Sequence, residues 1–225
     1  MSDASFSLPR SLARLRDPRV WGQILLILAA LPLSVIAVQI FMRDASSFYT
    51  FSPEGYGRYW SYAVTMFAHI FGGTLALFLG PLQFVTPFRR RFPVAHRRVG
   101  YAYFFGVTIG AASAFHMVFD VELTRTVGFA VGLFCLAVCW VLTAVLAYRA
   151  VTRRRFALHQ QFMAQNYALT LSFVVTRWLF DLDIAFIQNM GPMRYITMGW
   201  VGWVMPLFLV GAAFQYRQII GAKAG

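Results

Sequence analysis

Six long apolar segments constrain what this chain can fold into more than any other feature. Each is long enough to cross the roughly 30 Å hydrocarbon core of a bilayer as a helix, which rises about 1.5 Å per residue. The chain has 225 residues, of which 59% are hydrophobic and 12% are charged, so little sequence remains for a soluble domain. The sequence therefore predicts an all-α, polytopic membrane protein with six transmembrane helices. The predicted spans are Val20–Met42, Tyr62–Val85, Val99–Phe119, Val127–Tyr148, Phe162–Phe180 and Ile196–Phe214.

The predicted domain organisation is simple. A basic cytoplasmic tail covers residues 1–19, a single six-helix transmembrane domain covers residues 20–214, and a short cytoplasmic tail covers residues 215–225. The first apolar segment follows several arginines, as the apolar part of a signal peptide would. It runs for 23 uncharged residues without a clear small-residue cleavage site, so we interpret it as a retained span.

Charge is sorted by side of the predicted membrane. Basic residues fill the two tails and the loops after spans two and four, whereas most of the acidic residues lie in the other loops. Because cytoplasmic loops carry an excess of Lys and Arg, we predict a multi-pass protein of the bacterial cytoplasmic (inner) membrane with both termini in the cytoplasm. The formal charge of +12 therefore indicates topology and contact with anionic lipid, rather than nucleic-acid binding.

Two predicted cytoplasmic loops contain the same short sequence motif. Arg89–Phe92 reads Arg-Arg-Arg-Phe and leads to His96, and Arg153–Phe156 reads the same and leads to His159. This repetition predicts that spans two and three form a hairpin related to spans four and five, and that the two hairpins build a central four-helix core. The other interpretation is that basic cytoplasmic loops resemble each other for topological reasons alone.

The four histidines divide into two levels when their depth is counted along the spans. His69 and His116 lie roughly 6 and 10 Å above the midplane, within the membrane. His96 and His159 lie roughly 16 to 20 Å below it, where headgroups and loop arginines can satisfy them. Ionisable groups at membrane depth are costly, and they favour a functional hypothesis.

Haem is the metal centre that this histidine pattern favours. Imidazoles from neighbouring helices at matched depth commonly hold b-type haem in membranes. His69 and His116 are therefore the first prediction for the ligands, and His96 and His159 are the second. Zinc or copper is disfavoured, since no carboxylate or thiolate lies at a matching position. For each histidine, a hydrogen-bonding role without any metal is the alternative.

The fifth span carries a polar stripe. Its members recur at helical spacing, so they share one face, which we expect to look into the bundle or onto a cavity. We expect Asn166 to contact a cofactor and Arg177 to stabilise a haem propionate or a quinone oxygen, unless Arg177 pairs with Asp181 or extends toward the interface. Spans two and three carry small residues, for which helix packing is a better interpretation than room for a cofactor ring. The stripe comprises His159, Met163, Asn166, Thr170 and Arg177.

Several phrases carry a family resemblance. From roughly Ala68 to Trp178, the chain resembles a family of bacterial predicted membrane proteins known only as a domain of unknown function. The resemblance implies a membrane location and no established reaction. At Gln165-Asn166 this sequence departs from the Arg-Ser expected in many relatives, which puts a role for that basic residue in doubt. The matching phrases are His69 with Gly72 and Gly73, Gly80–Phe84, His96-Arg97 before Gly100-Tyr101, Ala147–Ala150, His159 leading to Met163, Tyr167–Thr170 and Arg177.

A more distant analogy is to the haem-binding membrane domain of ferric-reductase-type proteins, which have six spans and histidines on central helices. Together these patterns favour a b-type haem protein that transfers electrons between quinol, or a bound quinone, and a redox partner or larger membrane complex. The alternative is a cofactor-free accessory subunit, or a small-molecule transporter whose path follows the polar face of span five. The residues do not decide whether the protein is an enzyme.

Overall fold

A computed structural model describes residues 33–122 and 126–222 of the chain. The predicted N-terminal tail, residues 1–19, and the first part of the predicted first span, residues 20–32, lie outside the described residues. The chain forms two compact units, Met1–Gln39 and Ile40–Gly225. In the first unit the described residues, 33–39, are helical, and everything that follows concerns the second unit.

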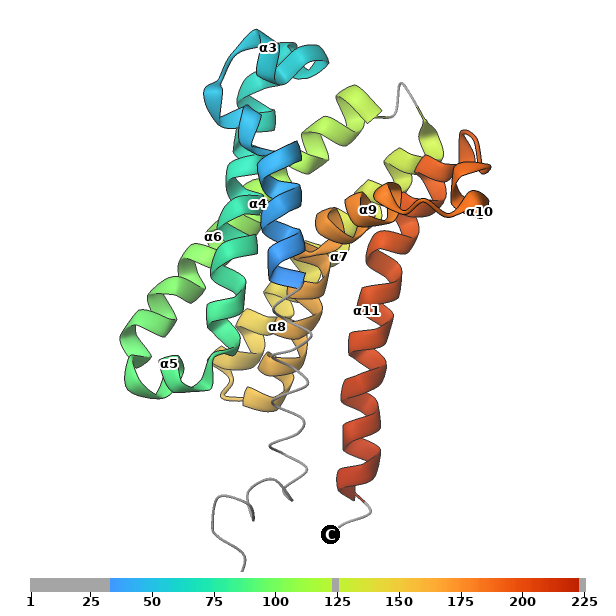
Figure 1. Ribbon diagram of the computed structural model, residues 1–225. Coiled ribbons are helices and arrows are strands. Elements are labelled where there is room, and N and C mark those ends of the chain that lie inside the picture. Colours follow the sequence, from blue (N-terminus) through green and yellow to red (C-terminus); the bar gives the residue numbers. More distant parts are fainter. Residues whose placement is uncertain (1–32, 123–125, 223–225) are drawn as a thin grey trace, which may run out of the picture. The chain divides into compact units, whose positions relative to one another are not determined.

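The second unit is all-helical over its described residues, which confirms the predicted class of secondary structure. Long helices run between two ends, with short helices in the connections (Figure 1). After the helical residues 40–44, the elements are η1 (Ser46–Thr50), α3 (Pro53–Tyr56), η2 (Gly57–Tyr62), α4 (Ala63–Phe84), α5 (Thr86–Arg91), α6 (Pro93–Met117), η3 (Val118–Glu122), α7 (Val127–Thr152), α8 (Phe156–Thr170), α9 (Ser172–Asp181), α10 (Ala185–Gln188) and α11 (Met193–Ala222).

Proline and capping chemistry set several helix boundaries. Pro53 opens α3, whose preceding residue Ser52 accepts a hydrogen bond at its Oγ from the amide of Gly55 at 3.2 Å. Pro87 lies in the first turn of α5, and Pro93 opens α6. Proline suits these positions because its missing N–H would have no partner within the helix. These boundaries place the short helix α5 between the two long helices α4 and α6.

Four helical segments are long and apolar enough to cross a membrane in the described part of the chain. They are Pro53–Phe84, Pro93–Asp120, Val127–Thr152 and Met193–Ile220, and they correspond to the predicted spans two, three, four and six, with span two ending one residue earlier than predicted. The predicted fifth span, Phe162–Phe180, is divided between α8 and α9 at Leu171. Thr170 donates its hydroxyl to the carbonyl of Asn166, one turn earlier, at 3.1 Å. Thr74, Thr108 and Thr143 make the same bond within undivided helices, so this bond alone does not account for the division, which hydropathy does not reveal.

Small residues hold the helices together, and large apolar residues face outward. The buried positions of α7 are mostly Ala and Gly, whereas Phe134, Leu142 and Val145 on the same helix are exposed. A water-soluble helix shows the opposite arrangement, because water favours burial of the large side chains. The pattern is the one expected of helices that face lipid. This pattern agrees with the membrane location that the sequence predicts.

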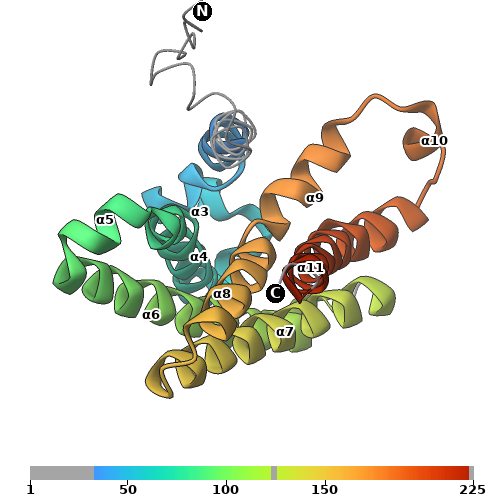
Figure 2. The ribbon, with the colours of Figure 1, turned by 90° about the horizontal axis from the view of Figure 1, so that it is seen from below.

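The helices pack as neighbours along the chain. α4 packs along α6, and α7 packs along α8, while α6 contacts α7 and α11 lies against α7, α8 and α9. Seen along the bundle, α8 lies between α4 and α7 (Figure 2). The buried core side chains come from α4, α6, α7, α8 and α11 and include Tyr103, Trp140, Leu169 and Trp203.

Glycines set the closest approach between α4 and α6. A Cβ added at Gly72 would lie 2.5 Å from the carbonyl oxygen of Gly106 and 2.6 Å from the amide nitrogen of Gly110. The two backbones therefore touch, and no larger residue fits at Gly72 unless the helices separate. This contact confirms the packing interpretation of the small residues and fixes the register between the helices.

Candidate functional site

His69 lies on α4 and is held by the neighbouring helix. Its Nδ1 is 2.9 Å from the backbone carbonyl oxygen of Gly110 on α6. Because a carbonyl can only accept a hydrogen bond, Nδ1 carries the proton in this bond. In the neutral ring, Nε2 is then left with its lone pair. Metal-binding histidines are commonly fixed in this way by a backbone carbonyl.

His116 lies on α6 but has a different environment. Its Nε2 is 3.1 Å from a carboxylate oxygen of Asp120, one turn later, and its side chain is 53% exposed. It lines an open pocket of about 360 Å³ together with Trp60 and Tyr62, and the Tyr62 ring lies edge-on to the imidazole. His116 is therefore partnered by an acid and accessible from outside the bundle.

The structure does not bring His69 and His116 into contact in the described residues. His69 is level with Gly110, and His116 lies six residues further along α6, a rise of about 9 Å. The depth count from the sequence places the two histidines only about 4 Å apart in height. The difference arises because the Gly72 contact, rather than the span centres, sets the register. Joint ligation by this pair stays a prediction.

The other two histidines begin ascending helices at the opposite end. His159, near the start of α8, has its Nδ1 2.9 Å from the backbone carbonyl oxygen of Ala147 on α7, so Nδ1 is again the donor. His96, near the start of α6, has a buried Nδ1 without a hydrogen-bond partner among the described residues, and the ring of Phe88 lies edge-on to it. Arg89 and His159 lie close enough to His96 for their charges to act on its imidazole.

A second unpartnered polar group lies near His96. The Nε2 of Gln83 is buried and has no hydrogen-bond partner in the described part of the chain. The Gln83 side chain lies beside Gly100, one helical turn after His96. A buried polar group without a partner costs about 1–3 kcal/mol. The adjacent helices α4 and α6 therefore each carry, at this point, a buried nitrogen that has no hydrogen-bond partner among the described residues.

The α8 part of the polar stripe in the fifth predicted span faces the bundle, as expected, since Met163, Asn166 and Thr170 are buried, whereas Arg177 on α9 is 49% exposed. Asn166 is fully buried, and its side chain accepts a hydrogen bond from Tyr103 at 2.6 Å. Its amide donates to the carbonyl of Trp140 at 2.6 Å and to the hydroxyl of Thr143 at 2.8 Å. The indole N–H of Trp140 donates to Thr170 at 3.0 Å. These bonds use the whole side-chain amide of Asn166 and join α6, α7 and α8.

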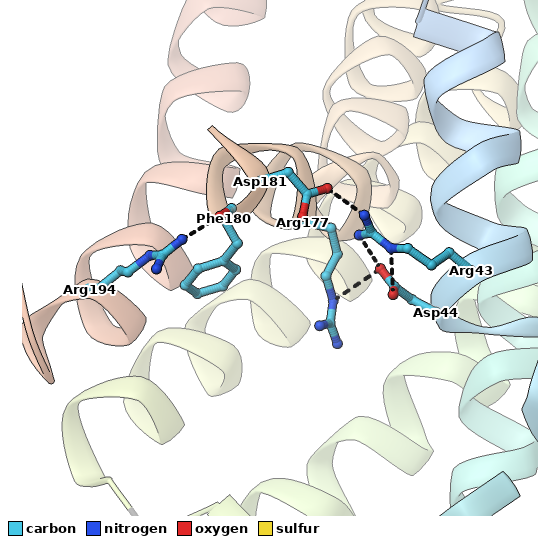
Figure 3. Close-up of polar contacts among 6 residues, drawn as sticks. All are labelled: Arg43, Asp44, Arg177, Phe180, Asp181 and Arg194. Carbon is cyan, nitrogen blue, oxygen red and sulfur yellow. Dashed lines mark hydrogen bonds and ion pairs between the residues drawn. The ribbon is translucent and has the colours of Figure 1, made fainter. Parts of the chain in front are cut away.

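Arg177 lies in a charged cluster that joins α9 to the helical residues 40–44 (Figure 3). Its Nε is 3.9 Å from a carboxylate oxygen of Asp44. Asp181, the partner that the sequence suggests for Arg177, instead accepts a hydrogen bond from Arg43 at 2.7 Å. Arg43 also binds Asp44 at 2.7 Å. The hydrogen bond to Asp44, and to a smaller extent the one to Asp181, raises the pKa of Arg43 above its ordinary value.

Comparison with known families supports the membrane assignment. The model of the family described as predicted membrane protein (DUF2306) matches residues 66–212. The chain belongs to this family. Searches among curated proteins and among solved structures find no match.

The match to DUF2306 extends beyond the resemblance seen in the sequence. It includes most of α11, and it covers all four histidines together with Asn166 and Arg177. It confirms the predicted family, which has no assigned reaction.

Sequence reasoning missed the partners of Asn166 in this DUF2306 protein. Tyr103 is fully buried and Trp140 is nearly so, yet both look like ordinary apolar residues of a membrane span. The available signal was chemical, because a buried phenol or indole needs a hydrogen-bond partner and Asn166 is the polar residue at a matching depth. Asp44 was also missed as the partner of Arg177, since the two residues are far apart in the sequence.

Proposed function

We propose that the chain spans the bacterial inner membrane six times, with both termini in the cytoplasm. The distribution of charge supports this topology. All six acidic residues that the structure describes lie near the end formed by η3, α3, α9 and α10, called here the acidic end (Figure 1). The turns at α5 and between α7 and α8 carry arginines at the opposite end, called here the basic end. By the positive-inside rule, the basic end faces the cytoplasm.

The four-helix core in this proposal consists of two related hairpins, α4 with α6 and α7 with α8. The extensive packing within each pair supports the arrangement, as does the repeated Arg-Arg-Arg-Phe phrase. The equivalent histidines, His96 and His159, each lie near the start of an ascending helix. Their hydrogen bonding differs, because only His159 has a carbonyl partner among the described residues.

The proposed activity is electron transfer by a b-type haem. The observation that carries the proposal is the pair of histidines at the basic end. His96 and His159 lie close enough for their charges to interact, His159 is fixed through Nδ1, and His96 has a buried nitrogen without a partner. Haem would supply a one-electron iron centre, while the chain would supply imidazoles, burial and hydrogen bonds. Arg89 is near enough to contribute positive charge toward propionates.

This proposal puts His96 and His159 before His69 and His116, the pair that the sequence favoured. The Gly110 carbonyl fixes Nδ1 of His69, which leaves Nε2 able to bind a metal. His116 contacts Asp120 through Nε2 and lies about one and a half helical turns beyond Gly110 on α6. Asn166 and Arg177 are committed to protein partners, so the proposal uses neither as a cofactor contact. His69 and His116 become the second candidate pair.

A visible spectrum of the detergent-purified protein, expressed with ample haem, tests the proposal. We expect a Soret band that is lost in His96→Ala and in His159→Ala and is retained in His69→Ala and His116→Ala. The four substitutions are matched, because each removes one imidazole. The opposite pattern would move the site to the second pair, and a wild-type protein without a Soret band would contradict haem binding. Reduction of the bound haem by a soluble quinol then tests quinol as the electron donor.

The alternative class is a cofactor-free accessory subunit or a transporter. A transport path along the fifth span would need polar groups that water or a solute can reach. Asn166 instead makes its hydrogen bonds within a closed network, with Tyr103 fully buried beside it. The transporter therefore receives less support than the haem protein. A spectrum without haem, together with co-purifying membrane subunits, would favour the accessory subunit.

A further inference from the structure

The arginines of the two ends have different partners. At the acidic end, Arg43 and Arg177 face carboxylates, and Arg194 donates to the carbonyl of Phe180. At the basic end, no arginine has an acidic partner among the described residues, because the structure places no described acid there. Most of these side chains are exposed. The exposed ones are Arg90, Arg91, Arg97, Arg98, Arg149, Arg153, Arg154, Arg155 and Arg217.

One part of the basic end is hollowed. An open groove of about 520 Å³ lies between the end of α5 and the first turns of α6. Arg91 and Arg98 line it, and Phe92, Val94 and Val99 supply apolar surface beside them. Phe92 and Val94 are 51% and 50% exposed. The groove therefore offers two guanidinium groups without acidic partners among the described residues, of which that of Arg91 lies over the Phe92 ring at 5.7 Å, next to apolar side chains at the end of a long apolar helix.

This combination matches one kind of ligand. A phosphodiester needs cationic hydrogen-bond donors, which guanidinium groups provide with favourable geometry. The acyl chains attached to it need apolar contacts, and only a lipid carries both within a short distance. A zwitterionic headgroup brings its own ammonium group, which the nearby arginines would repel. We propose that the groove between α5 and α6 binds an anionic phospholipid, with its phosphate between Arg91 and Arg98 and an acyl chain along Phe92, Val94 and Val99.

Native mass spectrometry of the full-length protein in mild detergent tests this site. Phosphatidylglycerol serves as the anionic lipid and phosphatidylethanolamine as the zwitterionic one. We expect the wild type to bind phosphatidylglycerol more tightly. A basic residue near an anionic surface contributes a factor of about five, so the double substitution Arg91→Gln with Arg98→Gln should weaken phosphatidylglycerol binding about thirty-fold. The site does not depend on haem, so either proposal can fail alone.

A matched variant separates a defined site from general positive charge. Arg153→Gln with Arg155→Gln removes the same charge from the same end but lies outside the groove, and it should change the affinity less than about three-fold. Arg91→Lys with Arg98→Lys keeps the charge and should retain most of the binding. All variants should keep the wild-type unfolding temperature, because the replaced side chains are exposed.

Three results would overturn the proposal. Equal losses in the groove variant and the matched variant would show diffuse attraction rather than a site. Equal affinity of the wild type for the two lipids would remove the charge argument. Displacement of phosphatidylglycerol by excess inorganic phosphate would identify a site for free phosphate, in which the apolar residues have no role.

Discussion

The acidic and basic ends of the bundle differ in whether their charged side chains have partners within the chain. At the acidic end, Arg43 forms ion pairs with Asp44 and Asp181 within the chain, and the imidazole of His116 lies 3.1 Å from a carboxylate oxygen of Asp120. At the basic end, arginines and the buried Nδ1 of His96 have no such partners among the described residues. Several charged groups of the acidic end therefore have partners within the chain, whereas the basic end is arranged to take its partners from outside the chain.

The packed helices connect these two ends. A substitution that separates the helices should therefore lower the free energy of unfolding more than a substitution at either end. Gly72→Ala places a methyl group against the backbone of α6, at 2.5 Å from the Gly106 oxygen. Because backbone cannot move aside as a side chain can, we expect a loss of about 1–3 kcal/mol in the free energy of unfolding. SDS-induced unfolding of the purified protein measures it.

The neighbouring glycine provides the control. A Cβ at Gly73 meets nothing within 4 Å, so Gly73→Ala should be neutral or stabilising by up to about 1 kcal/mol. The two variants make the same chemical change in adjacent positions of α4. Equal destabilisation would mean that the contact between α4 and α6 does not hold the two ends in register.

A smaller effect distinguishes paired from unpaired arginines. Arg43→Gln leaves Asp181 without its guanidinium partner and leaves Asp44 with Arg177 alone, and exposed pairs contribute about 0.2–1 kcal/mol each. We expect a loss of about 1 kcal/mol that shrinks as salt is added. Arg90→Gln at the basic end removes the same charge from an exposed side chain and should change stability by less than about 0.5 kcal/mol. A larger cost for Arg90→Gln would contradict the comparison.

Much of this arrangement follows from the sequence, because hydropathy and charge are local properties. The apolar segments predicted the long helices, the arginines predicted one basic end, and the helical spacing of Asn166 and Thr170 predicted that both face the bundle. Contacts between distant residues were not predictable in this way. The partners Tyr103 and Trp140 depend on how three helices rotate about their axes, which composition does not record.

Two further features required the packed structure. The depth count assumed that span centres align, but the contact at Gly72 sets His69 level with Gly110 and leaves His116 beyond it. The division at Leu171 lies within an apolar segment, so hydropathy cannot detect it. The sequence identified the candidate histidines, whereas their pairing depends on helix register.

The smallest predicted effect concerns a single backbone position at the basic end. Arg154 has φ = 59°, a left-handed conformation that favours glycine, and it follows the end of α7. The Arg155 amide bonds to the Ala150 carbonyl at 2.8 Å, and the Arg154 amide bonds to that of Val151 at 3.0 Å, a helix ending in which glycine is the usual residue. Arg154→Gly should therefore stabilise the protein by about 0.5–1 kcal/mol in detergent, measured by SDS-induced unfolding.

The control Arg153→Gly removes the same charge at φ = −88° and should be neutral or destabilising. Opposite signs for the two variants would show that the basic end keeps an arginine at a conformational cost, as expected if its positive charge serves partners outside the chain. Equal losses would show instead that the arginines at this turn stabilise the folded protein, and the contrast between the two ends would then no longer hold.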